Sequence, residues 1–169
     1  ERCGWHSGGG SAGYAFAARL AAAANVLDWL DTGSHGIAMD DVYGGTFRLF
    51  GSVRRRSAGL DVTFIDLNDT QALKASLKPN TRLIWVETPT NPMLKLVDLA
   101  NPVAFARNHG LLLVVYSTFC SPILPRPLDP CSHLLLHSPT YYLHPLPHLL
   151  PSSFSSPLPP PLPSHLRSL

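Results

Sequence analysis

The stretch Leu83-Ile84-Trp85-Val86-Glu87-Thr88-Pro89-Thr90-Asn91-Pro92 decides the fold of this chain. Its apolar first half predicts a buried strand. The two prolines end that strand and stiffen the turn that follows it. Glu87, Thr88 and Asn91 are then presented at the carboxyl end of a strand, where open α/β sheets bind their ligands. On its own, the stretch favours an ordinary exit from a strand into a loop.

Predicted strands and helices alternate on either side of this stretch. Strands are predicted at His35–Met39, Leu60–Leu67, Leu83–Val86 and Leu111–Val115. Helices are predicted over the Ala- and Leu-rich Tyr14–Leu30, from the glycines after Tyr43 to about Arg56, from Asp69 to about Leu77 and from Asp98 to His109. This alternation predicts an α/β fold, with a mostly parallel sheet and helices on both faces.

Composition excludes several classes of protein. The net charge of +2 is too small to indicate a nucleic-acid partner. No run approaches the roughly 20 apolar residues of a spanning helix, so we expect no membrane partner. The three cysteines lack metal-site spacing and favour a reduced, cytoplasmic setting. The histidines near the C-terminus lack carboxylate or cysteine partners, so no metal site is predicted.

The chain is compositionally divided. Every Asp and Glu lies at or before Asp129, and the only Lys or Arg beyond Pro130 is Arg167. Nine of the 17 prolines lie from Pro139 onward. We therefore expect a Gly- and Ser-rich flexible lead-in over residues 1–13, a globular unit over residues 14–142, and a low-complexity tail rich in Pro, Leu and Ser over residues 143–169.

The tail allows two interpretations. From Ser155 to Pro163 its prolines predict no helix or central strand, but an extended, polyproline-like or disordered segment. Its Pro-x-x-Pro spacing matches ligands of SH3 domains, although proline runs produce that spacing by chance. Its residue types are also those encoded by pyrimidine-rich codons, which is typical of translated intron or an out-of-frame segment.

Four stretches, in this order, resemble the Cys/Met-metabolism family of pyridoxal-phosphate (PLP) enzymes. They are Ala15-Phe16-Ala17, Met39-Asp40-Asp41-Val42-Tyr43-Gly44-Gly45-Thr46, Glu87-Thr88-Pro89-Thr90-Asn91-Pro92, and Thr118-Phe119 with Ser121-Pro122. The similarity runs from about Gly10 to Tyr142 and is nearest to cystathionine gamma-lyase. It implies part of a fold type I large domain, PLP as the cofactor, a sulfur amino acid as the substrate and, for the family, a homotetramer.

The resemblance also implies roles for individual residues. Tyr43 would stack on the pyridine ring of PLP, although an aromatic residue at a helix start is also ordinary. Asn91 would hydrogen-bond the 3-oxygen of the ring, and Glu87 would support that network. Thr118 would lie against the ring beside its nitrogen. Hydroxyl groups for the phosphate would come from Ser138 and Thr140, and a dianion at a helix start favours such donors.

Two departures from the family pattern affect catalysis directly. Tyr141 stands where the family has its Schiff-base lysine, and a phenol cannot form that bond. Covalent attachment of PLP is therefore not expected. Tyr116 stands where the family has the aspartate that pairs with the pyridine nitrogen, and a neutral phenol cannot replace that charge. No catalytic residue is therefore assigned.

Two further departures concern the phosphate site and chain length. The family's small-residue turn before the first helix reads Ala17-Ala18-Arg19 here, so Arg19 replaces a glycine while adding a charge that suits a phosphate. The chain is also shorter than family members, which have an upstream arm and a C-terminal domain. A truncated chain would expose apolar surface meant for subunit contacts.

These observations leave three function classes open. The first is a carbon–sulfur lyase of transsulfuration, converting cystathionine to cysteine, 2-oxobutanoate and ammonia, with impaired catalysis in this chain. The second is an inactive, truncated or mis-spliced remnant of such an enzyme. The third is an interaction module that acts through the proline-rich tail.

Overall fold

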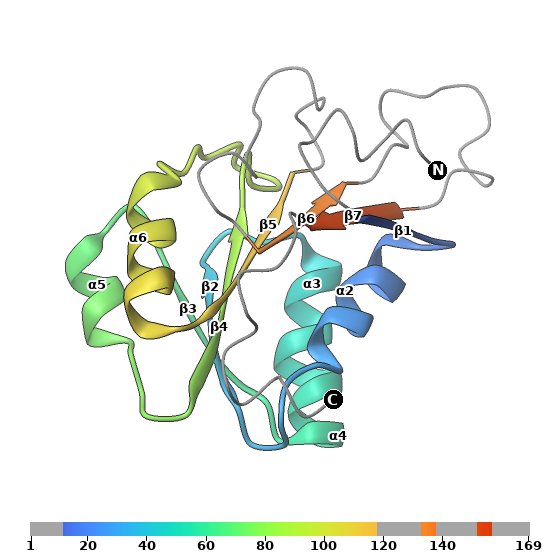
Figure 1. The fold of residues 1–169 in the computed structure, drawn as a ribbon, viewed down its shortest axis with the longest axis horizontal. Coiled ribbons are helices and arrows are strands. Elements are labelled where there is room, and N and C mark those ends of the chain that lie inside the picture. The colour runs from blue at the N-terminus through green and yellow to red at the C-terminus, as the bar shows by residue number, and fades with distance from the viewer. Residues whose placement is uncertain (1–11, 118–132, 138–151, 157–169) are drawn as a thin grey trace.

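A seven-stranded sheet organises the part of the chain that this computed structural model describes, residues 12–117, 133–137 and 152–156 (Figure 1). The strands are β1 Ala12–Phe16, β2 His35–Met39, β3 Asp61–Ile65, β4 Thr81–Glu87, β5 Leu112–Tyr116, β6 Leu134–His137 and β7 Ser152–Ser156. Their order across the sheet is β1-β7-β6-β5-β4-β2-β3. Strands β2 to β6 are parallel, whereas β7 runs antiparallel to β1 and β6. The predicted mostly parallel α/β sheet is confirmed.

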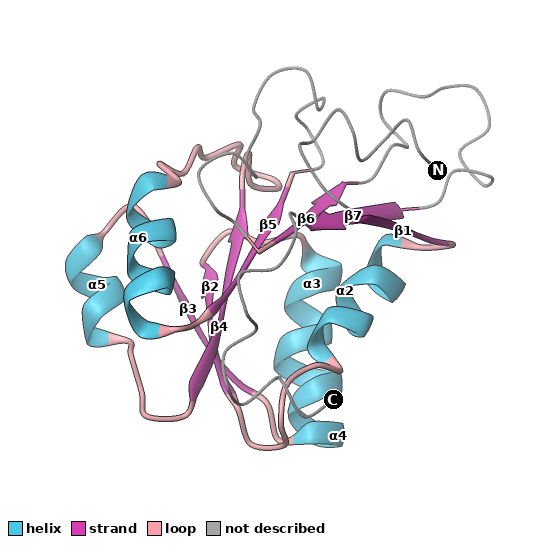
Figure 2. Ribbon diagram, viewed as in Figure 1, coloured by secondary structure: helices cyan, strands magenta, loops and turns pink. Residues whose placement is uncertain are grey.

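Helices cover both faces of the sheet (Figure 2). They are α2 Arg19–Leu27, α3 Gly44–Arg48, the π-helical η1 Leu49–Arg54, α4 Arg55–Ala58, α5 Thr70–Ala75 and α6 Ala100–His109. The consecutive segments α3, η1 and α4 lie with α2 on one face, and α5 and α6 lie on the other. None of these helices in the described ranges is both long and apolar enough to cross a membrane.

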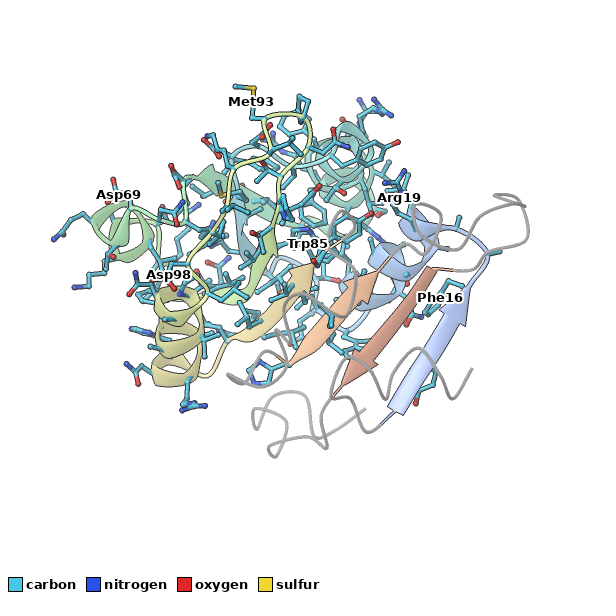
Figure 3. All side chains as sticks on the ribbon, turned by 90° about the horizontal axis from the view of Figure 1, so that it is seen from above. Phe16, Arg19, Asp69, Trp85, Met93 and Asp98 are labelled. Atoms are coloured by element: carbon cyan, nitrogen blue, oxygen red, sulfur yellow. The ribbon has the colours of Figure 1, made fainter. Side chains whose placement is uncertain are left out.

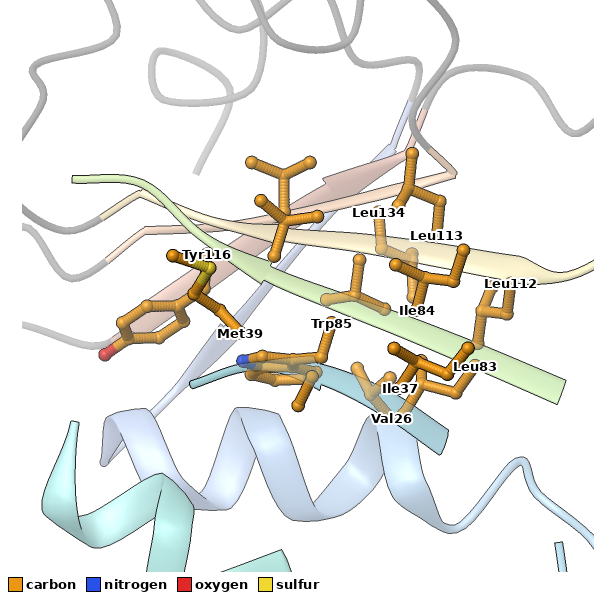
Figure 4. Packing of buried hydrophobic residues seen from close by; sticks show 14 of the residues in the cluster. Val26, Ile37, Met39, Leu83, Ile84, Trp85, Leu112, Leu113, Tyr116 and Leu134 are labelled. Carbon is orange, nitrogen blue, oxygen red and sulfur yellow. The ribbon is translucent and has the colours of Figure 1, made fainter. Parts of the chain in front are cut away.

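The core lies along the central strands β4 and β5 (Figure 4). All five residues of β5 are buried, as are six of the seven of β4. Such continuous apolar strands form because helices cover both faces of a parallel sheet. Trp85 of β4 packs edge-on against Phe50 of η1, with ring centroids 5.1 Å apart. Each fully buried side chain of this kind contributes about 1.5–3 kcal/mol to the free energy of unfolding.

Short-range sequence signals set several helix ends as predicted. The Oδ1 atom of Asp69 accepts hydrogen bonds from the backbone N–H groups of Gln71 (2.8 Å) and Ala72 (3.1 Å) at the start of α5. Gly110 ends α6 in the left-handed conformation, with φ of 63°. Gly33, where the sequence predicts the end of the first helix, has φ of 79° but lies in the turn before β2, because α2 already ends at Leu27 with Asp28 as its C-cap. Glycine adopts these angles without the steric cost that a β-carbon imposes.

The predicted helix over Tyr14–Leu30 is wrong at both ends. Residues Ala12–Phe16 form strand β1, and helix α2 spans only Arg19–Leu27. The helix begins without a side-chain cap at Ala18. Alanine-rich composition favours a helix locally, but hydrogen bonding of β1 to the distant strand β7 overrides that preference.

The expectation that residues from Ser155 onward form no strand is also wrong at its first two positions. Ser152–Ser156 forms β7, which pairs with both β1 and β6 and so lies inside the sheet. This segment contains no proline, and a backbone ladder needs only free N–H and C=O groups. Pro157 follows directly and lacks the N–H group that a further residue of the strand would donate. The run Pro157–Pro163 lies outside the described residues.

Candidate active site

Three parallel strands bring the predicted polar segments to one edge of the sheet. Because β2, β4 and β5 are parallel neighbours, their carboxyl ends lie together. Glu87 at the end of β4 is in register with Tyr116 at the end of β5. The segment from Asp40 to Tyr43 follows β2 at the same edge. This is the edge at which open parallel sheets bind ligands. The predicted position of Glu87 at the carboxyl end of a strand is confirmed.

A hydrogen bond joins two of the predicted residues, Tyr43 and Glu87. The backbone N–H of Tyr43 donates to Oε2 of Glu87 at 3.1 Å. Tyr43 is the residue before α3, so its N–H has no partner within the helix, and the carboxyl group of Glu87 satisfies it. Glu87 is 2% exposed, whereas Tyr43 is half-buried. The pair places an aromatic ring and a buried carboxyl group side by side at the start of a helix.

Burial raises the pKa of Glu87 to about 7. Loss of solvation disfavours the charged carboxylate and is the largest cause. The N–H of Tyr43 and the charge of Arg19 oppose it, while the nearby carboxylate of Asp41 adds to it. Glu87 therefore changes protonation near neutral pH, which makes it a group able to hold or release a proton in this site.

The ring of Tyr43 is fixed by two neighbours. Arg19, the first residue of α2, places the guanidinium carbon 4.4 Å from the centroid of the Tyr43 ring, within the range of a cation–π contact. Gly45 lies against the same ring, since a β-carbon built there would be 2.4 Å from Cε1 of Tyr43. Figure 3 shows Arg19 at the start of α2, on the right-hand side of the view. The sequence predicts for Arg19 a departure in the phosphate turn and a charge that suits a phosphate, but it does not predict the contact with Tyr43.

The loop after β4 is held by residues that the sequence analysis did not assign. Oδ2 of Asp41 accepts hydrogen bonds from Oγ1 of Thr90 (2.5 Å) and from the N–H of Met93 (2.9 Å). Thr90 is fully buried, and its Oγ1 also accepts the N–H of Lys95 at 2.8 Å. The half-buried Asn91 belongs to this loop. The local sequence around Thr90 does not predict the bonds to Asp41, because Asp41 is distant in the sequence.

Tyr116 occupies the edge of the sheet where the family resemblance implies a carboxylate. It is 2% exposed, and its ring stacks on that of Trp85 with centroids 6.1 Å apart and an interplanar angle of 24°. Its backbone carbonyl accepts the N–H of Thr88 at 3.1 Å. The register with Glu87 and the contact with Trp85 place the three side chains on the same face of the sheet.

The remaining predicted site residues, Thr118, Ser138, Thr140 and Tyr141, lie outside the described residues. The three lysines all lie within them. Lys78 forms an ion pair with Asp61 (2.6 Å), and Lys95 forms one with Asp40 (2.9 Å) that raises the pKa of its amine. Lys74 lies on α5, on the face of the sheet opposite to Tyr43.

Comparison with known proteins identifies relatives of this arrangement. A family model described as Cys/Met metabolism PLP-dependent enzyme matches residues 7–145. A cystathionine beta-lyase of Coxiella burnetii is 43% identical over 85% of this chain and 37% of its own length. A probable cystathionine gamma-synthase of Herpetosiphon aurantiacus is 48% identical over 76% of this chain and 40% of its own length.

A solved structure shows the same fold. The crystal structure of cystathionine gamma-lyase from Lactobacillus plantarum, complexed with L-serine, matches with a TM-score of 0.86 and 36% identity over 95% of this chain and 42% of that one. The chain thus spans about two fifths of the length of these relatives. By sequence and by fold, this chain belongs to the Cys/Met-metabolism family of PLP-dependent enzymes.

Proposed function

We propose that this chain is the cofactor-binding part of a PLP-dependent carbon–sulfur lyase similar to cystathionine gamma-lyase. The reaction of that type converts cystathionine to cysteine, 2-oxobutanoate and ammonia, and the substrate class is a sulfur amino acid. Relatives named as cystathionine lyases and synthases support this proposal. We also propose a cytoplasmic location and association with further copies of the chain.

The link between Tyr43 and Glu87 is the observation that carries this function. PLP is a flat aromatic ring with polar substituents and a dianionic phosphate. The Tyr43 ring, steadied by Gly45, suits stacking on such a ring. Asn91 offers an amide to a ring oxygen, and Arg19 adds a positive charge beside Tyr43. These residue types fit PLP, which, when bound, supplies an electron sink for cleavage of bonds in an amino acid.

We propose further that catalysis is impaired. Tyr141 stands where the family has its Schiff-base lysine. It has no amine to bond to the cofactor or to accept a proton from the substrate. Tyr116 places a buried phenol where the family has an aspartate. A phenol does not supply the negative charge of a carboxylate, so it does not stabilise a protonated ring nitrogen in the way that an aspartate does. PLP is therefore held without a covalent bond.

Restoring the two missing groups tests the proposal. PLP binding to the purified chain is measured by absorbance and fluorescence titration, followed by borohydride treatment and mass spectrometry. We expect saturable binding without a trapped adduct. The double variant Tyr116→Asp, Tyr141→Lys should give an adduct on residue 141, whereas the control Tyr142→Lys, with an amine one residue away, should give none.

Two results would contradict the proposal. Absence of saturable PLP binding by both the original chain and the double variant would exclude the cofactor-binding function. Sustained release of ammonia and 2-oxo acid from cystathionine by the original chain would exclude the impairment alone.

A further inference from the structure

Arg19 lies in a position that is unfavourable for the stability of its own helix. It is the first residue of α2, where the helix dipole is positive, and no acidic residue occupies the first turn of α2. Ala18, the N-cap residue of α2, provides no side-chain hydrogen bond to the start of the helix. A cation at this end of a helix raises the local positive potential. Its place is therefore better explained by what the guanidinium contacts than by helix stability.

The contacts of Arg19 lead into the site. The guanidinium carbon is 4.4 Å from the centroid of the Tyr43 ring. Its positive charge acts to lower the pKa of the buried Glu87. The ring of Tyr43 in turn packs on Gly45, and the Tyr43 N–H is bonded to Glu87. Arg19 thus covers part of the aromatic surface that a flat ligand would use.

This arrangement discriminates between ligands by charge. A ring that stacks on this surface of Tyr43 must displace the guanidinium and lose the cation–π contact. A neutral ligand forms no charged interaction with the guanidinium that would offset the lost cation–π contact. A ligand with a phosphate accepts charge-assisted, bidentate hydrogen bonds from the guanidinium, which offset the loss. The long side chain of arginine allows the guanidinium to move off the ring and reach a neighbouring anion.

On the basis of the proposed function, we propose that Arg19 is a specificity-determining residue that makes the Tyr43 surface selective for phosphorylated aromatic ligands over their neutral counterparts. The chemical class is an aromatic ring that carries a phosphate monoester. Glycine at this position, as the family resemblance implies, would leave the ring of Tyr43 uncovered, so a neutral ligand would no longer have to displace a guanidinium.

The test compares two ligands that differ only in the phosphate, PLP and pyridoxal. Their dissociation constants are measured by fluorescence titration for the full chain and for Arg19→Gln, Arg19→Lys and Arg19→Gly. Arg56→Gln is the control for net charge. Arg56 is exposed on α4, about 20 Å along the continuous helical segment that begins after Tyr43, at 1.5 Å per residue.

We expect Arg19→Gln to weaken PLP binding by about tenfold or more, the size of one charged hydrogen bond, and to leave pyridoxal binding unchanged or tighter. Arg19→Lys should keep part of the contribution of Arg19 to the preference for PLP, Arg19→Gly should lose that contribution, and Arg56→Gln should change neither constant. Thermal unfolding by circular dichroism establishes that each variant is folded.

An equal effect on both ligands would overturn the inference, as would tighter binding of PLP by Arg19→Gln or Arg19→Gly. If the original chain binds PLP but its affinity for pyridoxal is the same, the inference fails and the proposed function stands. If it binds neither ligand, both fail.

Discussion

The backbone N–H of Tyr43 donates a hydrogen bond of 3.1 Å to Oε2 of Glu87, 44 residues further along the chain. This bond ties the start of α3 to the end of β4 across the edge of the sheet. It gives Glu87 a structural role as well as a chemical one, because the same carboxyl group both completes a helix start and titrates near neutral pH.

Glu87 should make the protein less stable as the pH rises. Burial lifts its pKa from the ordinary 4.5 to about 7, so the folded state binds the proton more tightly than the unfolded chain. Its contribution to the free energy of unfolding is full below pH 4.5 and is lost by about pH 7, by an amount on the order of 3 kcal/mol. Glu87→Gln keeps an oxygen for the Tyr43 N–H but cannot titrate. Urea unfolding of both proteins is measured from pH 4.5 to 8. The free energy of unfolding of Glu87→Gln should rise relative to that of the original chain as the pH increases. A difference between the two that does not change with pH would contradict this prediction.

Gly45→Ala and Gly51→Ala should have opposite consequences for the site. Both glycines lie in the continuous helical segment, where alanine is favoured by about 0.5–1 kcal/mol. A β-carbon at Gly51 meets nothing within 4 Å, whereas at Gly45 it would lie 2.4 Å from Cε1 of Tyr43. Gly51→Ala should raise the melting temperature and leave PLP affinity unchanged. Gly45→Ala should move the Tyr43 ring and weaken PLP binding, as measured by fluorescence titration. Equal PLP affinities in the two variants would show that the ring position is unimportant.

Thr90 should be required for the order of the loop after β4. Its buried hydroxyl donates to Asp41 and accepts the N–H of Lys95, so Thr90→Val leaves the Lys95 N–H without this acceptor and Asp41 with only the N–H of Met93 as a donor. We expect a loss of about 1–3 kcal/mol in the free energy of unfolding, the usual cost of one polar group left without its partner. Thr90→Ser keeps the hydroxyl and should lose much less. Limited proteolysis should cut the valine variant faster near the exposed Met93 (69% exposed), which projects from the molecule in Figure 3. Identical cleavage of the two variants would contradict the role of the hydroxyl.

His35 should make the protein sensitive to acid. The fully buried imidazole lies between two hydroxyls, with Nδ1 2.8 Å from Oγ1 of Thr81 and Nε2 2.9 Å from Oγ1 of Thr63. Burial, aided by the charge of Lys78, lowers its pKa below 6.5, and Asp61 opposes this in part. The unfolded chain therefore binds the proton more readily, and stability falls as the pH drops below 6.5 toward the folded value.

His35→Gln should remove this part of the acid sensitivity, because glutamine keeps polar contacts but does not titrate in this range. The control is His109→Gln, at the end of α6 and away from β2. Thermal unfolding between pH 5 and 7.5 provides the measurement. An unchanged pH dependence in His35→Gln would show that the histidine is not the group responsible.

Much of the fold is encoded in short-range patterns. The apolar runs of β2, β4 and β5 and the cap at Asp69 were predictable because each depends on a few consecutive residues. The edge of the sheet that carries Glu87 followed from the parallel order of these strands. The roles of Tyr43, Asn91 and Tyr116 came from family resemblance instead, since nothing in their spacing specifies a cofactor.

The features that the sequence did not predict depend on contacts between residues that are far apart in the chain. Ala12–Phe16 reads as a helix until its pairing with Ser152–Ser156 is known. In the same way, the contact of Arg19 with Tyr43 and the bond of Thr90 to Asp41 join residues that no local window contains. Thr118, Ser138, Thr140 and Tyr141 remain predictions, because they lie outside the described residues.

The pairing of β1 with β7 has a consequence for synthesis on the ribosome. Ala12 is opposite Ser156, and within the described residues β1 pairs with no strand other than β7. Strand β1 must therefore wait until Ser152–Ser156 has been translated before it finds this neighbour. Until then its backbone groups stay exposed, and domains assembled from such long-range pairs fold slowly and are open to chaperones. Emergence of β7, rather than of the central strands, joins β1 to the sheet.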